Sequence, residues 1–330
     1  MSFTNGKDIM VFVETNENEP VKAALEVIAK ASELAKAESV NLVGLLLGSN
    51  TDEAAKICAA SGVNKIVIVE EDSENVEVIG NIVAEMAKKY DPSLLLMGST
   101  LAGKDIAAEV AKKCETACVT DVINIAEGEE GLTFTAPVYG GTLLNDVVIT
   151  NDSLKMASVR PGSFKKNELD ESLSAEIVKE EVEEIKDLKT IIKETIAEVG
   201  ESVNLEEAEI VVVGGRGMGS KENFELIHEL AKVCGGVVGG TRPVTEEDWI
   251  SRSQQVGQSG KIITPKLYIG AGVSGAIQHL SGISGSDYIV AINKDEDAPI
   301  FEIADVGIVG DAMKVLPLMI EAIKKIKEEN

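Results

Sequence analysis

The sequence predicts an α/β protein with two domains, an N-terminal doubly wound sheet of mostly parallel strands and a C-terminal Rossmann-like domain. The chain has 330 residues, enough for two hydrophobic cores. Short apolar runs alternate with longer stretches of helical period, which is typical of βαβ units. A stretch dominated by Glu and Lys, residues 165–207, interrupts this alternation. We therefore expect domains at 1–204 and 205–330, with a charged hinge in 165–207 that bends near Gly200–Glu207.

The first domain is expected to repeat the strand–helix unit along its length. Its expected strands are Asp8–Glu14, Val40–Leu47, Lys65–Val69 and Ser93–Met97. The helices that follow them are expected at Pro20–Lys36, Asp52–Ala60, Val76–Lys89 and Lys104–Lys113. From Val119 to Val159 shorter strands are broken by glycines such as Gly128 and Gly131, so we expect mostly antiparallel additions to the sheet there.

The stretch that follows has a different period. Ile177, Val178, Val182 and Ile185 are spaced as on one face of a helix, so the residues alone favour a helix within 173–200.

The second domain is expected to return to alternating strands and helices. Its expected strands are Ile210–Val213, Gly236–Val238, Leu267–Ile269, Tyr288–Ile292 and Ile308–Gly310. One helix is expected at Glu222–Val233 between the first two strands, and a last helix runs to about Lys327.

Charge and composition exclude several classes of function. The chain carries 56 acidic and 31 basic residues, a net charge of −25. Such a charge repels phosphates, which argues against nucleic acid as a partner and against adsorption to an anionic membrane. No run approaches the roughly 18 consecutive apolar residues that a membrane-spanning helix needs. The N-terminus enters a strand without a recognisable leader, so we expect a cytoplasmic protein.

Few side chains are suited to catalysis. The four cysteines, Cys58, Cys114, Cys118 and Cys234, are too scattered for a disulfide framework, and no further soft ligands accompany them to form a metal site. Only two histidines are present, and neither a catalytic triad nor a P-loop lysine motif can be assembled. We therefore expect no catalytic residues and a bound redox cofactor that supplies the chemistry.

The segment 256–279 is the most informative part of the chain. Gly270, Gly272 and Gly275 follow the strand Leu267–Ile269 at G-x-G-x-x-G spacing. Glycine allows a sharp turn and a close approach of the backbone to phosphate oxygens, and a helix N-terminus presents unpaired N–H groups. The segment therefore predicts a dinucleotide pyrophosphate site, in which Ser274 could cap the helix and also donate to phosphate.

Six blocks in the second half of the chain resemble the C-terminal domain of the electron-transfer flavoprotein alpha subunit. They are V-V-V-G-G-R-G (211–217), G-G-T-R-P (239–243), Q-V-G-Q-S-G-K (255–261), G-V-S-G-A-I-Q-H-L-S-G (272–282), I-V-A-I-N-K-D (289–295) and A-P-I-F-E-I-A-D-V-G-I-V-G-D (298–311). They follow the family's order and spacing, and V-R-P-G-S-F (159–164) has a counterpart in its N-terminal domain. The resemblance implies a C-terminal domain that binds FAD, and it favours a pair of strands over the helix in 173–200.

The resemblance also implies which residues bind FAD. It places the pyrophosphate at the turn 272–279 and the adenosine beside the ends of two later strands. The residues that it assigns are Arg216, Thr241, Arg242, Val256, Gly257, Gln258, Ser259, Ser274, Gly275, Ala276, Ile277, Gln278, His279, Asn293, Asp311 and Ala312. Each polar side chain also has a purely structural alternative, such as a helix cap, a turn or a surface ion pair.

Three of these side chains would lie near the flavin ring. A fixed cation at Arg242 would stabilise reduced, anionic flavin and so raise its reduction potential. Ser259 stands where the family often has threonine near the flavin N5, so the donor is kept but the stiffness of a β-branched side chain is lost. His279 would donate to the flavin O2 edge. Trp249 could pack on a partner, on the flavin loop or in the core.

The resemblance implies an electron carrier rather than an enzyme. Such an alpha subunit forms a heterodimer with a beta subunit and exchanges electrons with a flavin dehydrogenase such as an acyl-CoA dehydrogenase. Some family members resemble electron-bifurcating systems, which use NADH and ferredoxin, and this sequence does not choose between the two kinds.

Two functions outside the family are also compatible with a glycine-rich turn. A nicotinamide-dependent dehydrogenase is one, but Asn293 stands where such proteins have Asp or Glu at the end of the following strand. A nucleotide-binding regulatory module is the other, and it would leave the loops around Arg242 and Ser259 unexplained.

Overall fold

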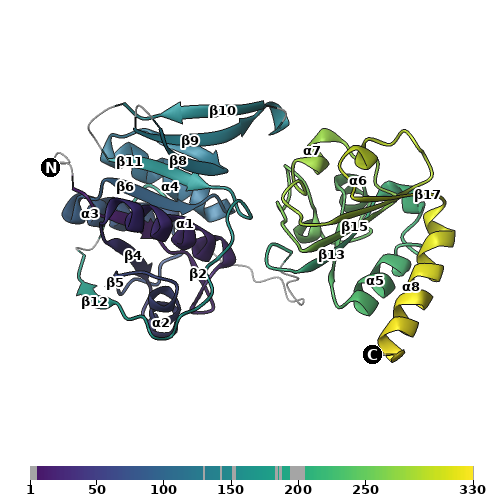
Figure 1. Cartoon of the computed structure of the whole chain (residues 1–330), viewed down its shortest axis with the longest axis horizontal. Helices are drawn as coiled ribbons and strands as arrows, with labels where there is room; N and C mark the ends of the chain where they lie inside the picture. Colours follow the sequence, from purple (N-terminus) through teal and green to yellow (C-terminus); the bar gives the residue numbers. More distant parts are fainter. Residues whose placement is uncertain are drawn as a thin grey trace. The chain divides into compact units, whose positions relative to one another are not determined.

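The chain forms two compact α/β units, Met1–Thr195 and Ile196–Asn330, each with its own sheets and hydrophobic cores (Figure 1). The computed structural model describes residues 6–128, 131–141, 143–150, 154–182, 185, 188–193 and 205–329. The predicted two-domain α/β class is confirmed. The expected bend near Gly200–Glu207 falls mostly outside the described residues, because these end at 193 and resume at 205.

The main sheet of the first unit has seven strands, all parallel, in the order β12-β5-β4-β1-β6-β11-β7. The strands predicted along its first half are β1 (Ile9–Phe12), β4 (Leu42–Leu47), β5 (Lys65–Val69) and β6 (Leu94–Gly98). The helices between them are α1 (Lys22–Glu38), α2 (Asp52–Ala60), α3 (Val76–Tyr90) and α4 (Leu101–Cys114). A short hairpin, β2 (Thr15–Asn16) and β3 (Glu19–Pro20), precedes α1.

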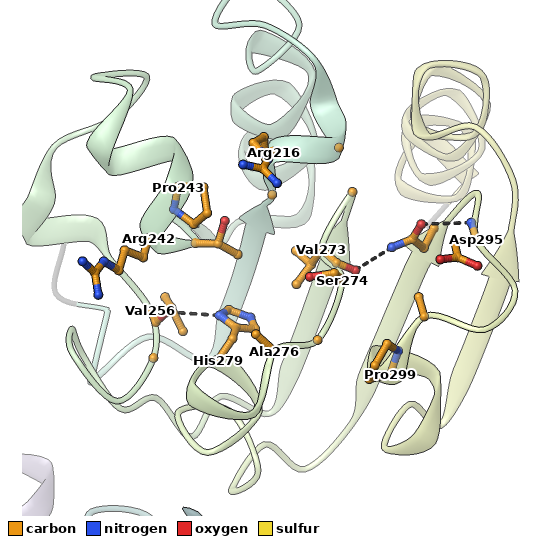
Figure 2. Close-up of a pocket in the computed structure, with 18 of the residues that line it drawn as sticks. Arg216, Arg242, Pro243, Val256, Val273, Ser274, Ala276, His279, Asp295 and Pro299 are labelled. Atoms are coloured by element: carbon orange, nitrogen blue, oxygen red, sulfur yellow. Dashed lines mark hydrogen bonds between the residues drawn. The ribbon is translucent and has the colours of Figure 1, made fainter.

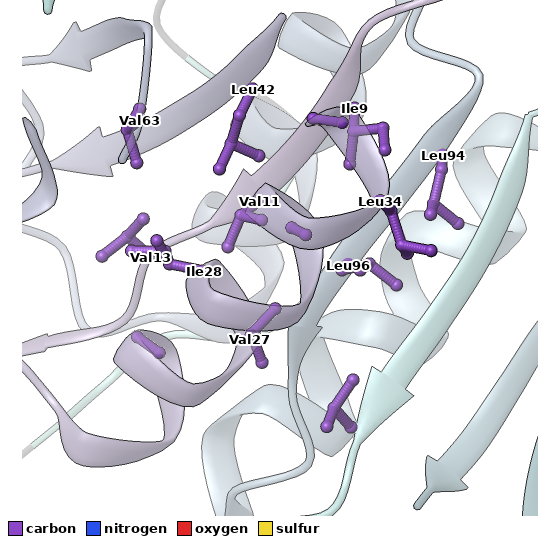
Figure 3. Close-up of a cluster of buried hydrophobic side chains, with 14 of the residues drawn as sticks. Ile9, Val11, Val13, Val27, Ile28, Leu34, Leu42, Val63, Leu94 and Leu96 are labelled. Atoms are coloured by element: carbon purple, nitrogen blue, oxygen red, sulfur yellow. The ribbon is translucent and has the colours of Figure 1, made fainter. Parts of the chain in front are cut away.

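Helices cover both faces of this sheet, as the doubly wound prediction requires. Side chains of α1 such as Val27 and Ile28 pack on Val11 and Leu96 of one face (Figure 3). Those of α3 and α4, including Ile82, pack on the other face. Apolar residues spaced three and four apart along α1 place one stripe on the sheet, and burial of that stripe stabilises both elements.

The prediction of mostly antiparallel strands between Val119 and Val159 is confirmed for three strands, but the prediction that these strands extend the main sheet is wrong. Within the main sheet, β11 (Lys155–Val159) lies parallel between β6 and β7 (Cys118–Val122). The remaining strands, β8 (Asn124–Gly128), β9 (Gly131–Val138) and β10 (Leu143–Val148), form a separate antiparallel sheet. Residues 156–159 of β11 are buried, and a strand covered on both faces is typical of a parallel position inside a sheet.

The sequence left open whether 173–200 forms a helix or strands, and the structure decides this for the residues that it describes. Glu176–Glu180 is a strand, β12, which lies parallel to β5 and pairs Ile177 with Ile66. Pairing along a sheet edge satisfies its backbone groups, and this overrides the local period. The strand that the resemblance implied is thus confirmed at 176–180. A second strand is absent from the described part of 173–193, which leaves out residues 183, 184, 186 and 187.

The second unit contains one parallel sheet of five strands in the order β14-β13-β15-β16-β17. The strands are β13 (Ile210–Gly214), β14 (Val237–Gly240), β15 (Leu267–Ala271), β16 (Ile289–Asn293) and β17 (Val306–Val309), close to the predicted positions. Helices are α5 (Glu225–Cys234), α6 (Arg242–Glu246), α7 (Ile277–Leu280) and α8 (Ala312–Glu329). The short helix α6 was not predicted. No helix within the described ranges is long and apolar enough to cross a membrane.

This strand order creates a topological switch point. From β13 the chain passes to β14 on one side, and then to β15 on the other side of β13. The connections therefore leave in opposite directions at the carboxyl ends of β13 and β15, where open α/β sheets form a crevice that accepts ligands. The glycine-rich turns noted in the sequence follow these two strands.

Candidate cofactor-binding site

Two glycine turns meet backbone to backbone at the switch point. Gly217 N–H donates to Gly272 O at 3.0 Å, and Gly215 N–H donates to Ala271 O at 2.9 Å. A Cβ on Gly215 would lie 2.2 Å from Gly272 O, and Gly272 itself has φ +64°. Any side chain here would force the two turns apart, so the glycines permit the crevice between β13 and β15.

A cavity of about 910 Å³ opens at this edge of the sheet. Arg242 and Pro243 lie on one flank of it, Asp295 and Pro299 on the other, and Ser274, Ala276 and His279 between them (Figure 2). Of the residues assigned from the resemblance, all except Ile277 line the cavity, and the Ile277 side chain is exposed. The structure therefore brings together segments that are far apart in the chain. The volume of the cavity suits a dinucleotide-sized ligand.

The turn after β15 presents unpaired backbone donors to this cavity. The N–H groups of Ser274, Gly275, Ala276, Ile277 and Gln278 find no hydrogen-bond acceptor among the described residues. Gly275 has φ +88°, and a Cβ there would lie 2.2 Å from Ile300 N, so glycine is required for this path of the chain. Consecutive free N–H groups favour an anion, and the cavity thus fits a phosphate or pyrophosphate group.

Cationic side chains add to this preference for an anion. Arg216 follows β13, Arg242 opens α6 and Lys294 follows β16, and all three line the cavity. The Arg242 Nε donates to Glu246 Oε1 at 2.7 Å, but both side chains are exposed, so this ion pair contributes little to stability. Sequence reasoning missed Lys294 and Asp295, although both stand in the block I-V-A-I-N-K-D directly after Asn293.

The expected helix cap at Ser274 is not what the structure shows. The helix α7 has a single turn, starts at Ile277, and has Ala276 at its N-cap position without a side-chain bond. The reason is that Gly275 turns the chain through the left-handed region before any helical residue follows. The Ser274 hydroxyl therefore lies at the cavity rather than on the helix.

Two polar residues on the far flank have structural partners. Asn293 Nδ2 donates to Val273 O at 2.7 Å, and Asn293 Oδ1 accepts from Asp295 N–H at 3.0 Å. Asp311 Oδ1 accepts from Met313 N–H at 3.1 Å at the start of α8. Both residues line the cavity, and these bonds hold their side chains in place at its edge.

The imidazole of His279 is buried and bonded on both sides. Its Nδ1 lies 3.1 Å from Val256 O and its Nε2 lies 2.8 Å from the Tyr268 hydroxyl. A carbonyl only accepts, so Nδ1 carries a proton, and a neutral ring then accepts from Tyr268 at Nε2. Burial lowers the pKa of His279 to about 4 and raises the pKa of Tyr268. Donation to a ligand, as expected from the resemblance, would require one of these two bonds to break.

The loop 256–260 forms another wall of the cavity. Gln258 N–H donates to Gln278 O at 2.7 Å, and a Cβ on Gly282 would lie 2.5 Å from Gly257 Cα, so the loop packs closely on the segment around α7. The Ser259 hydroxyl accepts a hydrogen bond from Gln255 Nε2 at 3.0 Å.

Trp249 packs inside the second unit. Its ring meets that of Phe224 edge to face, with centroids 6.1 Å apart, and it contacts the core formed with α5 and β13. Of the three possibilities that the sequence left open, the structure shows packing against the core.

Taken together, the switch point, the free N–H groups and the three cationic side chains are the features typical of α/β proteins that bind nucleotide-type cofactors. Comparison with protein families identifies the chain more closely. Residues 9–185 match the model of the electron transfer flavoprotein domain, and residues 204–284 match that of the electron transfer flavoprotein FAD-binding domain. The chain belongs to the electron transfer flavoprotein alpha subunit family, also named FixB.

Individual relatives match over nearly their whole length. The electron transfer flavoprotein subunit alpha of Thermoanaerobacterium thermosaccharolyticum is 40% identical, covering 97% of this chain and 99% of the relative. Protein FixB of Clostridium saccharobutylicum is also 40% identical, covering 99% of each chain. The acryloyl-CoA reductase electron transfer subunit beta of Anaerotignum propionicum is 33% identical, covering 97% of this chain and 96% of the relative.

Proposed function

We propose that this chain binds one FAD in the cavity of its second unit and relays electrons as the alpha subunit of a heterodimer. The observation that carries the proposal is the row of free N–H groups from Ser274 to Gln278 beside the two glycine turns. Arg216 and Lys294 would add positive charge around the pyrophosphate, which the net charge of −25 would otherwise repel.

The residues of the chain bind and orient the cofactor, and FAD itself supplies the electron-transfer chemistry when bound. Arg242 and Ser259 lie on the flank expected for the flavin ring, and the far flank with Asn293 and Asp311 is expected to hold the adenosine. Ile277 is expected to contribute its backbone N–H only, because its side chain is exposed. The electron transfer subunits among the relatives of this chain support a carrier role without catalysis of its own.

The proposed partners follow from the family. A beta subunit would complete the heterodimer, and electrons would enter from, or leave to, a flavin dehydrogenase acting on a CoA thioester. The relative from Anaerotignum propionicum supports this, because its name assigns it to acryloyl-CoA reductase. A cytoplasmic location remains the expectation from sequence, and nucleic acid and membrane insertion are not part of the proposal.

An anaerobic reductive titration tests this function. The chain is co-purified with its beta subunit, the bound flavin is quantified by visible absorbance, and dithionite is then added. One FAD per heterodimer that takes up two electrons supports a simple carrier, whereas two FAD per heterodimer would indicate a bifurcating complex. A colourless heterodimer that takes up no added FAD would refute the proposal.

The same titration tests the role of Arg242. Arg242→Gln should lower the reduction potential of the FAD, because a cation a few ångströms from a reduced, anionic flavin contributes about 1–4 kcal/mol. Arg252→Gln is the matched control, since it removes the same charge from an exposed residue outside the cavity lining. Equal potentials in the two variants would contradict the role of Arg242.

A further inference from the structure

We infer that Gln255 is a positioning residue, which turns the Ser259 hydroxyl into a hydrogen-bond donor for the ligand in the cavity. Gln255 does not line the cavity and is only 4% exposed. Its side-chain amide nevertheless joins Ser259, which lines the cavity, to the helix that carries Arg242, since Nε2 lies 3.0 Å from Ser259 Oγ and Oε1 lies 2.9 Å from Thr245 Oγ1. This inference rests on the proposed function and adds a residue that acts through another.

The backbone of Gln255 is fixed by the sheet edge. It forms a parallel bridge with Gly240, its carbonyl accepts from Lys261 N–H at 2.8 Å, and the next residue, Val256, donates to Gly240 O at 2.9 Å. Because hydrogen bonds fix both the backbone and the side-chain amide of Gln255, the position of its Nε2 atom relative to the Ser259 hydroxyl is fixed as well.

A hydroxyl has one proton and can also accept. When Ser259 Oγ accepts from Gln255 Nε2, its own proton is left for another acceptor. Ser259 is exposed and lines the cavity, so that acceptor is the ligand. The bond also restricts rotation of the serine side chain, which makes up for the β-methyl group that a threonine would have had.

Thr245 holds the amide in this orientation when its hydroxyl donates to Gln255 Oε1 rather than to Arg242 O. Its hydroxyl lies 2.9 Å from Gln255 Oε1 and 2.9 Å from Arg242 O, two acceptors that compete for one proton. Turning the amide around would place Oε1 against Ser259, and the serine proton would then be donated to Gln255 instead of to the ligand. The hydrogen bonds from Thr245 through Gln255 to Ser259 therefore connect the helix that carries Arg242 to the donor at Ser259.

The test is a double-mutant cycle on the reduction equilibrium of bound FAD in the intact heterodimer. Ser259→Ala should shift this equilibrium by about tenfold, which is about 30 mV for a two-electron couple. Gln255→Met, which keeps the volume but removes the amide, should shift it at least threefold in the same direction. The double variant should match Ser259→Ala alone, because Gln255 acts through that hydroxyl.

Three further variants separate this role from a structural one. Gln254→Met is the matched control, since the neighbouring amide donates to Val238 O at 3.0 Å and lies outside the cavity lining; it should leave the equilibrium unchanged. Thr245→Val should shift it in the same direction as Gln255→Met, whereas Thr245→Ser, which keeps the hydroxyl, should behave as wild type.

Three results would overturn the inference. They are an unchanged equilibrium in Ser259→Ala, an unchanged equilibrium in Gln255→Met, and additive shifts in the double variant. A wild-type heterodimer without FAD would overturn the proposed function and this inference with it. Stoichiometric FAD whose reduction equilibrium is insensitive to Gln255 would overturn the inference alone.

Discussion

At the residue scale, burial decides what His279 can do. The sequence places this histidine beside the glycine turn and makes it a candidate donor, but its two bonding partners come from elsewhere. Tyr268 lies on β15 and the Val256 carbonyl lies in the loop that precedes it. The buried ring is held neutral, because desolvation penalises its charged form. His279 therefore joins α7 to β15 and to the loop around Val256.

This burial makes the stability of the second unit depend on pH. The pKa of His279 is about 4 in the folded chain and about 6.5 when unfolded, so the unfolded state binds more protons between these values. The free energy of unfolding should therefore fall as pH is lowered from 6.5 toward 4, by up to about 1.4 kcal/mol per pH unit from this group. Chemical denaturation at a series of pH values measures the slope.

The His279→Gln variant should lack the pH dependence of the free energy of unfolding that His279 contributes. The chain offers an internal control, because its other histidine, His228, is exposed, and His228→Gln should keep the wild-type slope. Parallel curves for wild type and both variants would contradict a neutral, buried His279.

At the scale of elements, the site depends on the contact between two turns. Sequence reasoning identified G-G-R-G after β13 and G-V-S-G after β15 as separate motifs. Only the pairing of β13 with β15 places Gly215 and Gly217 against Gly272. In the first unit, pairing with β5 at the edge of the sheet likewise explains why residues 176–180 form a strand despite their helical period.

Gly272→Ala should therefore destabilise the second unit and weaken FAD binding. The added Cβ would lie 2.8 Å from Gly217 C, on top of the cost of roughly 1–2 kcal/mol for a left-handed residue with a side chain. The readouts are the free energy of unfolding and the dissociation constant for FAD.

Gly235→Ala provides the comparison for this prediction. Gly235 also has positive φ, +75°, but a Cβ there meets nothing within 4 Å. The Gly235→Ala variant should lose only the free energy of unfolding that the left-handed conformation costs, and its affinity for FAD should be unchanged. If both variants lost the same stability and the same affinity, the contact between the turns would not matter.

At the scale of the whole molecule, each of the two units has its own hydrophobic cores, and the sequence between their sheets is rich in Glu and Lys. Each unit has a parallel sheet covered by helices, and the proposed cofactor cavity belongs to the second unit alone. We therefore expect two unfolding transitions in calorimetry. FAD at a hundred times its dissociation constant should stabilise only one of them, by about 2.7 kcal/mol.

Core variants assign the transitions. Leu96→Ala in the first unit and Leu230→Ala in the second remove fully buried side chains. Each should cost about 2–5 kcal/mol and lower the melting temperature of its own unit by several degrees. A single transition, or two transitions that both shift in each variant, would show that the units unfold together.

The sequence by itself determined the α/β class, the two units, most strand and helix positions and the segments that form the cavity. These features are encoded in local period, glycine turns and short motifs, which depend on neighbouring residues. The tertiary structure alone decided that β11 is inserted between β6 and β7, that β12 pairs with β5, that His279 is bonded to Tyr268, and that Gln255 links Thr245 to Ser259. Strand pairing and hydrogen-bond partners join residues that are distant in sequence, and no local pattern specifies them.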